Sequence, residues 1–192
     1  FNSEGKMCPI YMRWGSMIYR CHSEKFKVKR PSYKHTSMTE EWLKFSCFRE
    51  WYLKNSYADK LELDKDLKTL GSNYYSPETC LLVSQEVNNF VIGLSSKKGV
   101  LPIGVRLYKD RNKKYGAQIN RGFGTEAISN HYTALEAHKA WQLAKSERAL
   151  SLALKQPNKD VKIALENIAE ILINHIKNDI ETNFKKEENK YV

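Results

Sequence analysis

Apolar side chains recur along the first third of the chain with the spacing of helices. In residues 11–22 they fall three or four positions apart, which predicts a helix with one core-facing side. Residues 39–52 repeat this spacing after a Thr and two Glu residues, so a second helix is expected there, with its aromatic side chains in the core rather than stacked on bases. The stretch between them, residues 23–38, is basic and rich in turn formers, which predicts a loop.

From residue 61 the spacing of apolar residues changes from that of a helix to that of a strand. Leucines at alternate positions in residues 61–67 predict a short strand whose other face carries Asp64 and Asp66. After a turn-rich stretch and a short apolar run, residues 84–93 predict a helix that begins at a capping Ser and ends at a Gly. Residues 95–102 are small and basic and end in Pro, as is typical of a linker.

Beyond this linker the chain predicts a sheet and two helices. Residues 103–132 alternate apolar and polar positions, which predicts three antiparallel strands whose turns are short. Residues 133–154 predict a helix that packs on this sheet. Residues 158–184 predict a long helix whose apolar stripe must bury against either the rest of the chain or the same helix of a second copy. The stripe consists of Val161, Leu165, Ile168, Leu172, Ile176 and Ile180.

These elements predict an α+β protein with two domains. Residues 1–94 form the first domain, residues 95–102 a linker, and residues 103–154 a small domain of three strands and a helix. The helix over residues 158–184 is expected to pack on this body or to form a homodimer.

The charge distribution of the chain indicates a polyanionic partner. The 192 residues include 32 Lys or Arg against 22 Asp or Glu, a net charge of +10, and 41% hydrophobic residues, which is enough for packed cores. Residues 1–60 hold 12 basic and 6 acidic side chains and residues 101–150 hold 9 and 4, whereas residues 61–100 hold 4 and 5. Two basic segments around an Asp-bearing centre favour a polyanion as the partner, lying along both segments and passing a candidate metal site. The alternative is a solvated basic surface that binds nothing.

Compartment and redox state follow from two further features. The sequence contains no run of about 18 apolar residues and shows no secretory leader. We therefore expect a cytoplasmic location and no membrane contact. The four cysteines contain no C-x-x-C pair and are expected to be reduced thiols.

Several short motifs occur in an order that resembles a known protein family. They are W-x-x-M-x-x-R-C at 14–21, E-E-W-x-x-F-x-x-F at 40–48, L-D-K-D-L at 63–67, Y-S-P-E-T-C at 75–80 and V-N-N at 87–89. Together they resemble the HNH-type homing endonucleases of tailed bacteriophages. Downstream, G-V-x-x-Y-K at 104–109, Y-x-A-x-I-N at 115–120 and T-x-x-E-A-H-x-A-W-x-x-A-K at 133–145 resemble the small Apetala-two type DNA-binding domain of plant ethylene-response factors.

The first resemblance implies a metal-dependent nuclease with a strand, loop, strand and helix around its metal. Lys65 occupies the place where such an enzyme has its catalytic His, and a lysine ammonium would stabilise phosphate rather than act as a base. Asp64, Asp66 and Asn88 are the candidate ligands for Mg²⁺ or another divalent metal, because this ion prefers hard oxygen ligands. With Lys65 they form the candidate catalytic set. Alternatively, Asp64 and Asp66 form salt bridges to neighbouring lysines.

Two histidines outside these motifs are weaker candidates for the base. His22 and His35 have basic or polar neighbours, which favours phosphate contacts or a plain surface position for both.

The second resemblance implies a sheet that lies in the major groove, and the residues suit this. Arg106 and Tyr108 share a face of the first strand, and Gln118 and Asn120 share a face of the second; Arg forks onto guanine, and Gln or Asn onto adenine. The remaining candidate contacts are basic side chains of the strand ends and the turn: Lys109, Arg111, Lys113, Lys114 and Arg121. The alternative is an exposed polar face without a ligand. Because residues 129–132 depart from the usual apolar-Gly step, the third strand is expected to be bulged or shortened.

Three functions remain open from the sequence. The first is a DNA endonuclease of homing type that hydrolyses phosphodiester bonds in the cytoplasm of a bacterial host. The second is a DNA-binding or regulatory protein that keeps the fold without cleaving. The third is a basic, dimeric protein-interaction module.

Overall fold

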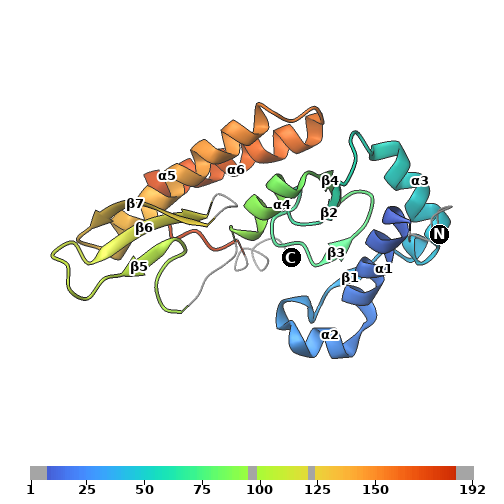
Figure 1. Ribbon diagram of the computed structural model, residues 1–192, viewed down its shortest axis with the longest axis horizontal. Helices are drawn as coiled ribbons and strands as arrows, with labels where there is room; N and C mark the ends of the chain where they lie inside the picture. Colours follow the sequence, from blue (N-terminus) through green and yellow to red (C-terminus); the bar gives the residue numbers. More distant parts are fainter. Residues whose placement is uncertain (1–7, 95–98, 121–123, 185–192) are drawn as a thin grey trace. The chain divides into compact units, whose positions relative to one another are not determined.

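The computed structural model describes residues 8–94, 99–120 and 124–184. Helices and short strands alternate along these residues, which confirms the α+β class (Figure 1). The chain divides into two compact units, residues 1–85 and 86–192, and each is described by itself below. This division falls ahead of the expected linker, because the helix that follows the first unit packs within the second.

Residues 8–85, the described part of the first unit, form three helices, two short 3₁₀ turns and four short strands. Along the chain they are α1 (Pro9–His22), α2 (Glu24–Lys29), η1 (Pro31–Tyr33), β1 (Ser37–Met38), η2 (Glu40–Leu43), α3 (Phe45–Asn55), β2 (Glu62–Asp64), β3 (Tyr74–Tyr75) and β4 (Leu81–Val83). Strands β1 and β3 pair in parallel, and β2 and β4 pair antiparallel with Leu63 opposite Leu82. The two small sheets leave the segment between β2 and β3 as a long loop.

Aromatic side chains fill the core of this unit. Trp42 and Phe48 are fully buried and meet edge to face, with ring centroids 5.2 Å apart. The indole N–H of Trp14 donates to the carbonyl oxygen of Trp42 at 2.7 Å. The expectation that these aromatics lie in the core is therefore confirmed for Trp42 and Phe48.

Two local predictions for this unit were wrong. The segment 23–38, expected as a loop, contains helix α2, because the Ser23 hydroxyl accepts the Phe26 backbone N–H at 3.2 Å and caps it. The single helix expected over residues 39–52 is divided into η2 and α3 at Lys44, which is extended (φ −88°, ψ 118°).

The second unit is a three-stranded sheet packed on helices. Its elements are α4 (Gln85–Ile92), β5 (Val105–Leu107), β6 (Tyr115–Asn120), β7 (Thr125–His131), α5 (Ala134–Ala153) and α6 (Lys159–Lys177). The antiparallel sheet has the order β5-β6-β7, and α5 runs along one of its faces (Figure 1). Ala117 and Ile119 of β6 are both 1% exposed. Their alternation leaves Gly116, Gln118 and Asn120 on the outer face.

A close approach at Gly104 fixes α5 to the start of the sheet. Gly104 has φ +79°, and a Cβ atom there would lie 2.0 Å from Cδ1 of the buried Trp141. His138, one turn earlier on α5, bonds through Nδ1 to the carbonyl oxygen of Ile103 at 2.8 Å. The residues just ahead of β5 therefore set where the helix lies under the sheet.

Helix α4 is held against α5 by two basic side chains. Arg148 forms an ion pair with Glu86 in the first turn of α4. At the other end of α4, the Lys145 ammonium donates to the carbonyl oxygen of Phe90 at 3.4 Å and lies 4.6 Å from the centroid of its ring. Burial, helped by the charge of Arg148, lowers the pKa of Lys145 to about 8.

Helix α6 is shorter than predicted and its apolar stripe is covered within the chain. It ends at Lys177 rather than at residue 184, because the backbone reverses at Asp179 (φ 55°) and returns Thr182 to the interior. There the Thr182 N–H donates to Nε2 of His138 at 2.9 Å. Four stripe residues, Val161, Leu165, Ile168 and Leu172, are at most 1% exposed. Of the two alternatives predicted for the stripe, the structure therefore shows burial of these four residues within the chain, where α6 packs on α5.

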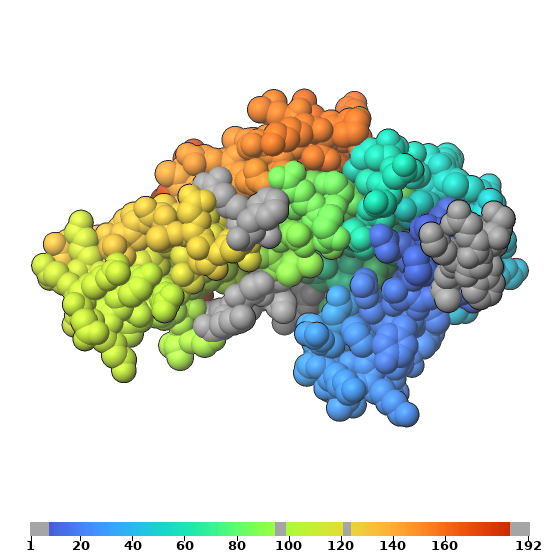
Figure 2. Space-filling view, in the orientation of Figure 1, coloured from blue at the N-terminus to red at the C-terminus, as the bar shows by residue number. Residues whose placement is uncertain are grey.

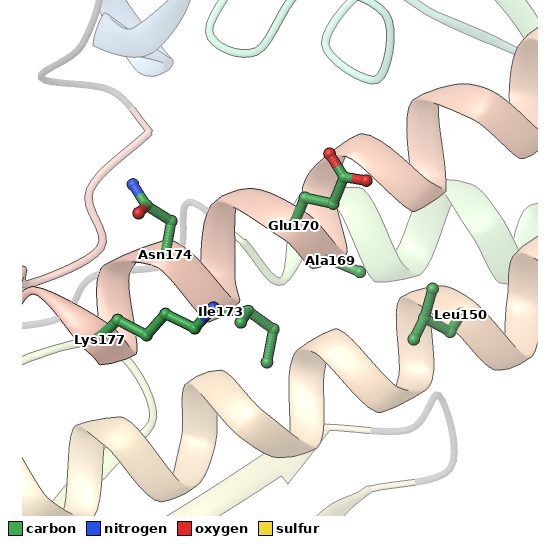
Figure 3. Close-up of a pocket in the computed structure, with 6 residues that line it drawn as sticks. All are labelled: Leu150, Ala169, Glu170, Ile173, Asn174 and Lys177. Atoms are coloured by element: carbon green, nitrogen blue, oxygen red, sulfur yellow. The ribbon is translucent and has the colours of Figure 1, made fainter.

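A shallow groove of about 280 Å³ remains between α5 and α6. Its lining residues are Leu150, Ala169, Glu170, Ile173, Asn174 and Lys177. Figure 3 shows Ile173 directed toward α5, whereas Glu170 and Asn174 point away from it. None of these residues is among the predicted site residues.

Candidate nucleic-acid interface and nuclease-like turn

Asp64 closes the turn that follows β2. Its Oδ1 accepts the backbone N–H groups of Asp66 at 3.0 Å and of Leu67 at 2.6 Å. Strand β2 therefore ends at Asp64, and the prediction that Asp64 and Asp66 project from one face of a strand was wrong. An Asp side chain that accepts amides two and three residues ahead favours a turn over an extended strand.

The Asp64 carboxyl is 6% exposed. Burial, together with the negative charge of Asp66, raises the pKa of Asp64 to about 6. The two backbone hydrogen bonds act in the opposite direction without cancelling this rise. The folded protein thus disfavours the ionised form of the Asp64 carboxyl relative to a carboxyl in water.

Lys65 closes the loop that begins at this turn. Its ammonium donates to Asp66 Oδ1 at 2.7 Å and to the carbonyl oxygen of Ser72. It also lies 5.9 Å from the centroid of the Tyr75 ring, and the residue is 8% exposed. The side chain at the expected His position therefore joins the two ends of the loop between β2 and β3.

Tyr75 connects this loop to helix α1. Arg20 of α1 donates from Nη1 to Tyr75 Oη at 3.3 Å, and its guanidinium carbon is 6.0 Å from the centroid of the Tyr33 ring. Burial raises the pKa of the Tyr75 hydroxyl, which keeps it neutral. Arg20 therefore links Tyr75, whose ring lies near the Lys65 ammonium, to Tyr33.

Within the first unit, the Asp64 and Asp66 side chains of the predicted catalytic set are engaged by groups of the chain itself. Asp64 uses an oxygen on two amides, Asp66 is paired with Lys65, and Asn88 lies on α4 in the other unit. Over residues 8–94, 99–120 and 124–184, no group of three or more His, Cys, Asp or Glu side chains could hold a metal. With the Lys65 ammonium in place, these residues do not fit a divalent ion. The candidate bases His22 and His35 are both exposed.

The outer face of the second unit's sheet carries an aromatic ring with two guanidinium groups close to it. Arg106 of β5 lies opposite Gly116 of β6, which lies opposite Asn130 of β7. A Cβ at Gly116 would lie 2.4 Å from Cε2 of Tyr108, so the ring of Tyr108 rests on this glycine. The guanidinium carbons of Arg106 and Arg111 are 5.3 Å and 4.2 Å from the centroid of that ring.

Two amide side chains continue this face along β6. Gln118 is half-buried and lies opposite Ala127, and Asn120 is exposed and lies opposite Thr125. A register shift between Ala117 and Gln118 leaves one residue of β7 without a partner, so the expected bulge in the third strand is confirmed. Arg121, the last candidate contact on this strand, lies outside the described residues.

The loop between β5 and β6 presents the remaining cations. Lys109, Arg111, Lys113 and Lys114 are all exposed, and Figure 2 shows this loop in yellow-green at the surface of its unit. The Tyr108 N–H donates to the carbonyl oxygen of Lys114 at 2.7 Å and closes the loop. Lys113 lies 5.4 Å from the centroid of the Tyr132 ring.

Sequence reasoning missed what organises this face. Tyr108 was predicted on this face, but the contacts of its ring with Arg106 and Arg111 were not. Asn130 and Tyr132 were not among the candidates. The one available signal is Gly116, because a glycine inside a strand marks a close approach by another group.

Comparisons with protein-family models, with curated proteins and with solved structures found no match to this chain. None of the helices in the described part of the chain is both long enough and apolar enough to cross a membrane.

Proposed function

We propose that the protein binds double-stranded DNA through the outer face of β5, β6 and β7. The observation that carries this proposal is the group formed by Arg106, Tyr108 and Arg111, which stands on the face away from α5. Two cations on one ring cost energy through mutual repulsion unless an anion lies nearby. A phosphate-bearing groove supplies that charge.

The face also suits base recognition. A two- or three-stranded ribbon fits the major groove, where an arginine can bond bidentately to guanine and an amide side chain to adenine. Arg106, Gln118 and Asn120 project on this face in alternate positions. Lys109, Lys113 and Lys114 in the adjoining loop supply contacts to the phosphate backbone, which position the protein without reading sequence.

Binding without cleavage is the form of this proposal that the turn at Asp64 supports best. Its carboxylate and the Lys65 ammonium are both engaged in closing the loop. Metal-dependent cleavage of homing type is the second candidate, favoured by the order of β2, loop, β4 and α4 along the chain. No step of hydrolysis is assigned to these residues.

A binding assay tests the proposal. Fluorescence anisotropy with a labelled mixed-sequence duplex is expected to show salt-sensitive binding that Arg106→Ala combined with Gln118→Ala weakens. Lys159→Ala combined with Asn167→Ala, a matched change of exposed residues on α6, should leave affinity unchanged. Equal affinity of the two double variants would refute the assignment to the sheet.

A cleavage assay separates the two candidates. We expect supercoiled plasmid and phage genomic DNA to remain intact with the wild-type protein and Mg²⁺ or Mn²⁺. Nicking that Asp64→Ala abolishes without loss of binding would establish the endonuclease instead.

A further inference from the structure

The Lys65 ammonium occupies a cradle built from oxygen atoms and an aromatic ring. Its hydrogen-bond acceptors are Asp66 Oδ1 and the carbonyl oxygen of Ser72, and Tyr75 offers its ring face. The buried Asp64 carboxylate lies close enough for the charge of Lys65 to favour its ionised form. Carboxylates and carbonyls at the end of a strand are also the groups that a hard divalent cation would need.

We infer that the ammonium group of Lys65 takes the place of a metal ion in this turn, so that the unit folds around an internal cation. A lysine cation is delivered by the chain itself and requires no metal from solution. Its removal would leave the Asp66 carboxylate and the Ser72 carbonyl oxygen without the cation that they share, and the buried Asp64 carboxylate without a nearby positive charge. This inference is independent of DNA binding by the sheet of the second unit.

The competing explanation is that Lys65 only ties the ends of the loop together. The two explanations differ in what replaces the side chain. If the cradle is a cation site, an external divalent cation should stabilise a variant that lacks the ammonium, whereas a simple tie cannot be replaced in this way.

Thermal unfolding of the full chain, followed by circular dichroism, distinguishes them. The wild-type Tm is expected to be the same in EDTA and in Mg²⁺ or Mn²⁺. Lys65→Ala should lower the Tm in EDTA by on the order of 5 to 10 °C, because the Ser72 carbonyl oxygen and the Asp66 carboxylate lose the buried ammonium that they share. Mg²⁺ or Mn²⁺ should then raise the Tm of Lys65→Ala.

Matched variants complete the test. Lys68→Ala, an exposed lysine of the same loop, should behave as wild type in every buffer. If Lys65→Ala does not fold, Lys65→Met keeps most of the apolar stem and is measured in its place. A wild-type Tm that rises with the divalent ion, or a Lys65 variant with the same Tm in EDTA and metal, would overturn the inference.

Discussion

The loop between β5 and β6 allows a quantitative prediction of how DNA affinity depends on salt. Changing Lys113 and Lys114 together to Ala removes two exposed cations. The hydrogen bond that closes the loop is kept, because it joins the Tyr108 N–H to a main-chain carbonyl. The double variant should therefore lose electrostatic attraction without losing the shape of the loop.

The size of the effect follows from counterion release. Each phosphate neutralised on B-DNA contributes about 0.9 to the slope of log K against log salt concentration. Loss of two contacts should reduce the magnitude of that slope by about 1.8. If the variant and the wild type have equal affinity when extrapolated to about 1 M salt, the variant should bind roughly 60-fold more weakly than the wild type at about 0.1 M salt. A structural effect alone would change affinity by the same factor at every salt concentration.

Anisotropy titrations at several salt concentrations measure this slope. Lys155→Ala combined with Lys159→Ala, which removes two exposed cations away from the sheet, is the control and should keep the wild-type slope. An unchanged slope for the Lys113 and Lys114 variant, or an equal reduction in the control, would refute the placement of DNA against this loop.

Three substitutions test the packing that supports the sheet. Gly104→Ala should destabilise the protein by about 2 kcal/mol or more in urea unfolding, because the new Cβ meets Trp141 and φ is positive. Gly116→Val should displace the Tyr108 ring and weaken DNA binding, with a smaller effect on urea stability. Lys145→Met should be more stable than wild type at pH 7. That advantage should shrink by about 1.4 kcal/mol per pH unit from pH 8 to 10.5, where the folded wild type loses a proton that the unfolded chain keeps. A constant difference across that range would count against a buried charge at Lys145.

Elements with strong local signals were predictable from the sequence. The helix from Thr133 was expected to begin at this residue, and the structure shows Thr133 and Glu136 forming reciprocal hydrogen bonds at its start. The alternation in β6 correctly separated Ala117 and Ile119 from Gln118 and Asn120. In these cases the pattern is set by residues a few positions apart, so the sequence contains the whole signal.

Features that depend on distant contacts were not predictable. The parallel pairing of β1 with β3 joins Ser37 to Tyr74 and Met38 to Tyr75, and a strand of two residues has no periodicity. The early end of α6 depends on an Asp in a conformation that usually requires Gly. The contacts of the turn at Asp64 were not predictable for the same reason. The hydrogen bond from Lys65 to the carbonyl oxygen of Ser72, seven residues ahead, has no recognisable sequence pattern.

The attachment of α4 to α5 determines how the protein can be divided for experiments. A fragment that ends at residue 94, the boundary the sequence favours, would keep α4 but remove α5. Glu86 would then lose its ion pair with Arg148, and the carbonyl oxygen and ring of Phe90 would lose the Lys145 ammonium. A fragment that begins at Ser84 keeps these contacts and is the better starting point for isolating the unit that is proposed to bind DNA.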